Sequence, residues 1–381
     1  MKSERFRLLT PAQPPFVSVY LDDSRDTADA ESQLETVWRG LRRQLEGMDT
    51  AEDIVALVED AVLRTRPAVG RQGRGVIATR KQVLINEHLP SPPPAAVLRV
   101  SDYPYILPLV EAGGPRPMYV FAAVDHIGAD ITVHQGGVVR SESVDGGGYP
   151  VHKPVTAGWH GYGDLQRTTE EAVRMNVRAV ADRLTELVDE VGPEVVFVCG
   201  EVRSRTDVVS ALPERVAARA SQLHAGARGR RVEEPELVDL VDAEFERRRH
   251  AEIAEIAERF NSETARGSGI AVEGIASACA ALRAGVVETL IVGELGDATL
   301  ITGEDRTTIA PDADALSEFG EPPYRVARAD EALPFAAITL GASLIRAEDG
   351  FAPADGIAAM LRYPLAGTVA DAGAPNRSIT R

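Results

Sequence analysis

The feature that most constrains this chain is a long stretch without apolar periodicity, Tyr149 to Arg167, which a strongly periodic helical segment follows. The stretch reads YPVHKPVTAGWHGYGDLQR and combines Gly and Pro with aromatic and cationic side chains. Loops of this length are uncommon in compact domains and are usually functional or disordered. Exposed aromatic and cationic side chains suit contact with bases and phosphates. We therefore predict a flexible loop that inserts into a binding partner.

The segment after the loop is predicted to be a helix. Thr168 and Glu171 have the spacing of a capping box, which would start the helix there. Gly192 and Pro193 would end it. Apolar residues recur at helical spacing and would form one face of this helix. They are Val173, Val177, Val180, Leu184, Leu187 and Val191. A rigid helix would therefore support the loop.

Eight side chains in the loop are candidates for binding RNA. Aromatic rings stack on bases, cationic groups pair with phosphates, and histidine donates hydrogen bonds at modestly acidic pH. The alternative is a surface loop without a partner, against which the large aromatics Trp159 and Tyr162 argue. The candidates are Tyr149, His152, Lys153, Trp159, His160, Tyr162, Gln166 and Arg167.

Composition limits the remaining possibilities. The 381 residues are 44% hydrophobic, so the chain can form packed cores, and the length predicts two or three domains. The formal charge of −17 excludes a globally basic surface, so any contact with RNA must come from local patches. Cys199 and Cys279 are expected to be buried, and no zinc spacing is present. No cofactor or metal is expected.

Targeting signals are also lacking. The start, MKSERFRLL, has no apolar segment typical of a signal peptide, and no apolar run approaches the length of a membrane span. We expect a cytoplasmic protein that binds neither DNA nor a membrane.

Gly-containing linkers divide the chain into three predicted regions, residues 1–112, 116–230 and 231–381. The middle region combines three strands in a meander with the loop, its helix, a further strand and a helix from about Val208 to Leu223. This order predicts an α/β domain of ribonuclease-H type, within an overall mixed α/β (α+β) fold. The first region is predicted to contain a strand at Phe16–Asp23, helices at Leu34–Leu45 and Ile54–Leu63, and strands at Gly75–Thr79 and Gln82–Leu89.

The third region is predicted to begin with a long charged helix from about Glu234 to Phe260. The arginine cluster Arg247 to His250 lies within this helix. We interpret the cluster as solvated surface, with contact to RNA or a partner as the alternative. A helix at Val272–Leu282, a strand at Val287–Leu295 and a helix at about Asp330–Leu340 are expected to follow.

The third region also resembles a known family. The run CAALRAGVVETLIVGEL, with GIAAMLRY about sixty residues later, is similar to the carboxy-terminal domain of the archaeal and eukaryotic class-one release factors and of Pelota. The middle region matches the family's middle domain in element order, and the long loop takes the place of its Gly-Gly-Gln loop. Across the whole chain, the pattern most resembles the bacterial branch, the ribosome hibernation factors called Balon.

The resemblance implies a three-domain adaptor that enters the ribosomal A site and contacts large- and small-subunit rRNA. The first domain would lie at the decoding centre, and the middle-domain loop at the peptidyl transferase centre. The third, a kink-turn-protein-like α/β/α domain, would bind a translational GTPase, which is EF-Tu for Balon-like factors. Exposed residues near the end of its strand, such as Glu294 and Asp297, are the candidates for that contact.

Departures from the family pattern argue against catalysis. The match nearest to Gly-Gly-Gln runs from Gly161 to Gln166, without paired glycines, and Gly146 to Gly148 precede Tyr149 rather than Gln. The Asn-Ile-Lys-Ser type of stop-codon motif is absent from the first region. We therefore predict a hibernation factor that keeps the ribosome idle, is not an enzyme and releases no peptide.

Two catalytic alternatives remain open. One is a peptide-release or ribosome-rescue factor. The other is a ribonuclease-H-like nuclease, whose metal ions would need clustered carboxylates. Asp125, Glu171 and Glu201 are the candidates. Each has a simpler role: Asp125 in a hairpin turn, Glu171 in the capping box and Glu201 at a strand exit.

Overall fold

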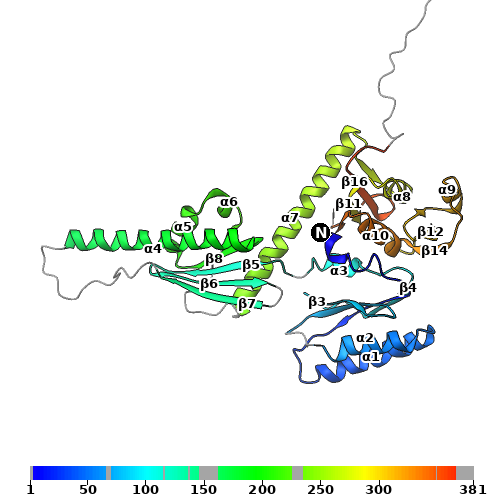
Figure 1. The fold of residues 1–381 in the computed structure, drawn as a ribbon, viewed down its shortest axis with the longest axis horizontal. Coiled ribbons are helices and arrows are strands. Elements are labelled where there is room, and N and C mark those ends of the chain that lie inside the picture. Colours follow the sequence, from blue (N-terminus) through cyan, green and yellow to red (C-terminus); the bar gives the residue numbers. More distant parts are fainter. Residues whose placement is uncertain are drawn as a thin grey trace, which may run out of the picture. The chain divides into compact units, whose positions relative to one another are not determined.

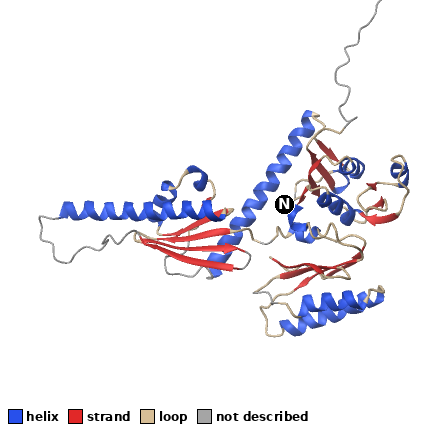
Figure 2. Cartoon of the chain, viewed as in Figure 1, coloured by secondary structure: helices blue, strands red, loops and turns tan. Residues whose placement is uncertain are grey.

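The fold was analysed in a computed structural model that describes residues 3–65, 70–114, 116–135, 138–145, 162–224, 235–348 and 350–365. It contains four β-sheets and helices of widely different length, so the mixed α/β class is confirmed (Figures 1 and 2). The chain forms two compact units, Pro115–Arg249 and the combination of Met1–Gly114 with His250–Arg381. The division into three domains stays a prediction.

The unit Pro115–Arg249, called the middle unit below, is built on a five-stranded sheet with the order β7-β6-β5-β8-β9. β5, β6 and β7 form the predicted antiparallel meander, whereas β8 and β9 are parallel to β5. The strands are β5 (Tyr119–Val124), β6 (Gly128–Gln135), β7 (Val138–Asp145), β8 (Val195–Gly200) and β9 (Ala220–Gln222).

Helices cover both faces of this sheet. On one face lie α4 (Tyr162–Val191), α5 (Val202–Ala211) and α6 (Glu214–Ala217) (Figure 1). The predicted apolar stripe of α4 is confirmed, because its residues from Val173 to Val191 belong to the core on this face. The other face packs against the first turns of α7 (Pro235–Arg266) through Leu237 and Val241.

Two sequence-based predictions in the middle unit are wrong. α4 begins at Tyr162, so Thr168 and Glu171 lie inside the helix and do not cap it. A helix over 208–223 is also wrong, because α5 ends at Ala211 and the chain then forms α6 and β9. Pro213, which cannot continue a helix, directly precedes α6.

The other unit, called the joint unit below, combines both ends of the chain. Its amino-terminal sheet has the order β3-β2-β1-β4, with α1 and α2 packed on one face. The predicted strands and helices are confirmed, and β4 was missed. The elements are η1 (Ser3–Phe6), β1 (Phe16–Asp22), α1 (Ala30–Gly47), α2 (Glu52–Leu63), β2 (Gly73–Ala78), β3 (Val83–Leu89), β4 (Val97–Ser101) and α3 (Leu107–Glu111).

The carboxy-terminal part of the joint unit has one sheet with the order β10-β16-β11-β15 and a smaller one with the order β13-β12-β14. α8 and α10 cover one face of the larger sheet, and Ile253 and Phe260 of α7 pack on the other. The elements are β10 (Ala271–Glu273), α8 (Ile275–Arg283), β11 (Val287–Val292), β12 (Thr299–Thr302), β13 (Ile309–Ala310), α9 (Ala313–Ser317), β14 (Arg325–Arg328), α10 (Ala329–Thr339), β15 (Ser343–Arg346), η3 (Ala354–Gly356) and β16 (Ile357–Leu361).

One apolar core joins the two parts of the joint unit. Phe335 of α10 lies 6.5 Å from Phe16 of β1 and 5.5 Å from Tyr103, measured between ring centroids. All three side chains are buried. Because residues from both parts form this core, we expect the isolated segment 231–381 to be unstable, so its binding must be tested in the whole chain.

Both cysteines are buried, as predicted. Burial raises the pKa of the Cys199 and Cys279 thiols to about 12, so neither forms a thiolate at neutral pH. Within the part of the chain that the structure describes, the helices are too short or too polar to cross a membrane.

Candidate functional site

Most of the predicted RNA-binding loop lies outside the described residues. This applies to Tyr149, His152, Lys153, Trp159 and His160. The remaining candidates, Tyr162, Gln166 and Arg167, lie on the first two turns of α4. The loop as a contact site therefore stays a prediction, and the structure defines the base on which it stands.

That base is one end of the middle sheet, where the turn between β5 and β6 meets the end of β8. Asp125 Oδ1 accepts hydrogen bonds from the backbone N–H groups of Ile127 (2.7 Å) and Gly128 (2.8 Å). β7 ends at the same place, because Asp145 pairs with Gly128. The last residue of β7 and this turn therefore lie at the same end of the sheet.

Two glycines allow the backbones to approach closely at this end. A Cβ at Gly128 would overlap the carbonyl oxygen of Val144, and one at Gly200 would overlap that of Val124. Gly200 also has a φ of +110°, which is unfavourable for residues with a side chain. The sheet end is therefore tightly packed.

α4 is anchored to the same turn. The Asn176 Nδ2 donates a hydrogen bond to the carbonyl oxygen of His126 (2.9 Å), and the His126 Nδ1 lies 3.4 Å from the Glu201 Oε2. Fourteen residues of α4 precede Asn176, which at 1.5 Å per residue corresponds to about 20 Å of helix. Figure 1 shows α4 continuing beyond the ends of the strands.

The carboxylates proposed for a nuclease do not gather into a metal centre. Asp125 stabilises the turn, and Glu201 follows β8 and accepts a hydrogen bond from Ser204 Oγ (3.1 Å), so their simpler roles are confirmed. Glu171 is exposed on α4. Among the residues with described positions, no group of three or more His, Cys, Asp or Glu side chains could hold a metal ion.

The candidate partner residues lie directly after β11, at the end of the strand. The side chains of Glu294 and Asp297 are 91% and 98% exposed. Arg346 donates hydrogen bonds to Glu294 Oε1 (2.7 Å) and to the carbonyl oxygen of Gly293 (2.6 Å). Arg328 donates to Asp297 Oδ1 (3.1 Å) and to the carbonyl oxygen of Gly296 (3.0 Å). Both acids are accessible to a partner and held in place by arginine.

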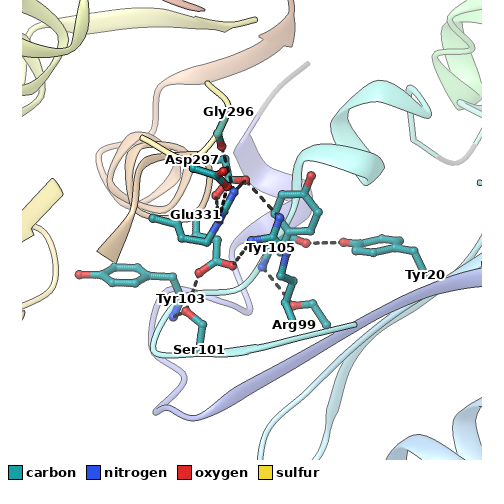
Figure 3. A network of polar contacts seen from close by, with 11 residues as sticks. Tyr20, Arg99, Ser101, Tyr103, Tyr105, Gly296, Asp297 and Glu331 are labelled. Carbon is teal, nitrogen blue, oxygen red and sulfur yellow. Dashed lines mark hydrogen bonds and ion pairs between the residues drawn. The ribbon is translucent and has the colours of Figure 1, made fainter. Parts of the chain in front are cut away.

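A buried charge network lies behind this acidic segment (Figure 3). Arg328 also donates two hydrogen bonds of 3.0 Å to the carboxylate of Asp330, and these bonds raise the pKa of the guanidinium. Asp330 and Glu331 in turn face Arg99 of β4, with N···O distances of 3.4 and 3.3 Å. The network therefore connects the acidic segment to the amino-terminal sheet.

Glu331 is the most buried carboxylate of this network, with a side chain only 3% exposed. It accepts a hydrogen bond of 2.6 Å from Ser101 Oγ. Burial raises the pKa of Glu331, and the hydrogen bond from Ser101 opposes this change. Arg99 also lies 4.6 Å from the centroid of the Tyr105 ring, a distance typical of a cation–π contact.

The arginine cluster on α7 is neutralised locally. Arg247 and Arg248 pair with Glu244, Arg249 pairs with Glu246, and His250 lies 3.8 Å from Glu348. Hydrogen bonds, first of all from Arg247, lower the pKa of Glu244 to about 2. This arrangement agrees with a solvated helix surface.

Sequence reasoning missed two exposed arginines of α4, Arg174 and Arg178. Both lie in the predicted helix, four residues apart and away from its apolar stripe. Their position on the polar face of the predicted helix was the sequence signal that identifies them.

Comparisons with known proteins agree with the resemblance. Residues 118–266 match the bacterial archaeo-eukaryotic release factor family 2. The chain is 61% identical, over 363 residues, to the uncharacterized proteins MT2704 and Rv2629 from two strains of Mycobacterium tuberculosis. These alignments cover 95% of this chain and 97% of each relative. The chain belongs to the bacterial archaeo-eukaryotic release factor family.

Solved structures of low sequence identity were also found. Archaeoglobus fulgidus Pelota is 16% identical with a TM-score of 0.37, over 78% of this chain and 81% of its own. The archaeal Pelota in a structure described as ribosome-bound Pelota and ABCE1 is 17% identical with a TM-score of 0.40, over 95% and 94%. These scores are too low to carry a functional argument, so the family assignment rests on sequence.

Proposed function

We propose that this protein is a ribosome hibernation factor of the Balon type. It occupies the ribosomal A site, with its amino-terminal sheet at the decoding centre and residues 149–167 at the peptidyl transferase centre. It keeps translation idle and releases no peptide. The observation that carries this proposal is membership of a release-factor family combined with a sequence that lacks Gly-Gly-Gln at the corresponding loop.

The middle unit supports a contact role for the loop. Residues 146–161 connect two described segments, β7 and α4, at the end of the sheet that Asp125 and Asn176 stabilise. A loop on such a base can make contacts at a distance from the sheet without disturbing its core.

The absence of peptide release follows from chemistry. A release factor needs glycines that let the backbone approach the ester and a glutamine that positions the attacking water. Here Gln166 is the fifth residue of α4, where the helix restricts its backbone. The protein would therefore act as a stoichiometric ligand of the ribosome.

EF-Tu is the proposed protein partner of the carboxy-terminal part. Glu294 and Asp297 are exposed and ordered by Arg346 and Arg328, so they can pair with cationic groups at low cost in side-chain entropy. In the whole chain, Glu294→Ala with Asp297→Ala should weaken EF-Tu binding about fivefold, which corresponds to about 1 kcal/mol. Glu318→Ala with Glu321→Ala, two exposed acids of the same unit, is the matched control.

Co-sedimentation with ribosomes tests the central proposal. The protein should migrate with 70S particles from stationary cells in a low-salt sucrose gradient and leave them as salt rises. Ribosomes that carry labelled peptidyl-tRNA should retain the label at saturation. Protein that remains at the top of the gradient contradicts ribosome binding, whereas release that Gln166→Ala abolishes contradicts only the hibernation role.

A further inference from the structure

The exposed flank of α4 carries two arginines that lack the partners such residues usually have. Arg174 and Arg178 lie one turn apart, and both side chains are exposed. Glu170 and Asp182 stand four residues before and after them, at the spacing of favourable helical pairs. Even so, none of the described carboxylates lies within ion-pair distance of either arginine.

Several arginines of the middle unit differ from this pair. Arg183 pairs with Glu142, Glu186 and Glu190, Arg215 pairs with Asp189, and Arg247 pairs with Glu244. Like charges four residues apart destabilise a helix slightly. Such a pair gains no ion-pair stabilisation, and a local rule broken without compensation is typical of a functional surface.

The position of the pair agrees with a contact role. Nine residues, or about two and a half turns, separate Arg174 from Arg183, so Arg174 projects from the flank opposite β7. The pair brackets Asn176, which anchors α4 to the His126 turn. α5 begins beside the same turn, because Glu201 lies next to His126, and it adds an exposed Val202 (71%) and Arg203 (85%).

We propose that Arg174 and Arg178 bind the phosphodiester backbone of ribosomal RNA, an inference that rests on the proposed function. Each guanidinium presents planar donors that match a phosphate group in a two-point contact. On a chain with a formal charge of −17, binding of RNA requires such a local cationic patch. The exposed Met175 follows Arg174 directly in the helix and adds apolar surface beside this charge.

Salt dependence of ribosome binding tests this assignment in the full-length protein. Each phosphate contact contributes roughly 0.7–0.9 to the slope of log K against log salt concentration. Arg174→Ala with Arg178→Ala should therefore reduce the slope by roughly 1.4–1.8. At physiological salt the affinity should fall about tenfold or more.

The matched control is Arg215→Ala with Arg247→Ala. It removes the same net charge from exposed positions of the same unit, but these arginines already have carboxylate partners. The control should bind like the unaltered protein. An equal loss of ribosome affinity in both variants would mean that net charge alone acts, and this would overturn the assignment. An unchanged salt slope in the α4 variant would also overturn it. If the unaltered protein binds no ribosomes, the proposed function fails and this inference with it.

A photoreactive residue at position 178 identifies the contacted molecule. We expect a crosslinked product that ribonuclease digests. A ribonuclease-resistant product with a ribosomal protein would overturn the assignment of RNA and indicate an acidic protein surface instead.

Discussion

Two groups of charged residues, one in the joint unit and one in the middle unit, differ in burial and in pairing. In the joint unit, Asp330 and Glu331 are largely buried and face Arg99 and Arg328. In the middle unit, Arg174 and Arg178 are exposed and face none of the described carboxylates. The buried, paired charges of the first group hold the structure together, whereas the exposed arginines of the second group are available to another molecule.

Because of this difference, substitutions in the two groups should affect different properties, folding stability in one and binding in the other. A substitution in the buried network should change the free energy of unfolding first and partner binding only through the position of the acidic segment. A substitution on α4 should change binding alone. The four predictions below test that separation, from the largest expected effect to the smallest.

Removal of Arg99 should have the largest effect. Breaking a buried ion pair by removing one partner costs about 3–5 kcal/mol, and Arg99→Ala should fall at the lower end, about 3 kcal/mol, because its side chain is partly exposed. Urea unfolding followed by the fluorescence of Trp38, a buried residue of the joint unit, measures this change. A Trp159→Phe background leaves Trp38 as the only tryptophan.

A double variant controls for loss of volume. Arg99→Met with Glu331→Met replaces both charges by apolar groups of similar size, so it should recover most of the lost free energy. A double variant no more stable than Arg99→Ala would show that packing, not charge pairing, determines the cost.

Substitutions in the loop should have the second largest effect, and this effect should be on ribosome binding only. Replacing Lys153, Trp159 and Tyr162 together by Ala should weaken ribosome binding about five- to a hundredfold, which corresponds to one stacking contact of roughly 1–3 kcal/mol. The melting temperature should remain nearly unchanged, and alanine at Tyr162 is compatible with the first turn of α4. Loss of thermal stability instead of affinity would mean that these residues are packed in a core.

A pH dependence distinguishes burial from pairing at Glu331. Burial raises the pKa of this carboxyl in the folded state, so folding favours its protonated form. Its stabilising contribution is then fully present below the pKa of the unfolded chain and is lost as pH rises through the folded pKa.

Comparison with a neutral side chain isolates this contribution. The difference in unfolding free energy between the natural protein and Glu331→Gln should decrease as pH rises from about 4 to 7. Urea titrations of both proteins across this range measure it. A difference that instead increases with pH would show that the pairing with Arg99 outweighs burial.

How much of this could be predicted from sequence depended on the range of the interactions. Strong local periodicity predicted α4 after Val173 and the elements β1, α1 and α2. Short strands such as β12 and β14 were missed, because four residues carry little periodicity and their pairing partners are distant in sequence. The start of α4 was misplaced because Thr168 and Glu171 imitate a cap inside a longer helix.

The sites show the same limit. The exposure of Glu294 and Asp297 followed from their place beyond an apolar strand. The link from Asp297 through Arg328 and Asp330 to Arg99 did not, because 231 residues separate Arg99 from Asp330 and only the tertiary fold brings them together. The exposure of Arg174 and Arg178 was readable from the sequence, but their lack of partners was not.

The stability of the α4 variant gives the smallest expected effect and the sharpest test of the comparison. If Arg174 and Arg178 serve only binding, replacing both by Ala should not lower the free energy of unfolding. It should raise it by about 0.2–0.5 kcal/mol, because a repulsive pair disappears and Ala is the best helix former. Thermal unfolding of this variant beside Arg215→Ala with Arg247→Ala, which loses two ion pairs, measures the contrast. If the α4 variant is the less stable of the two, its arginines contribute to the fold, and the distinction between the two regions does not hold.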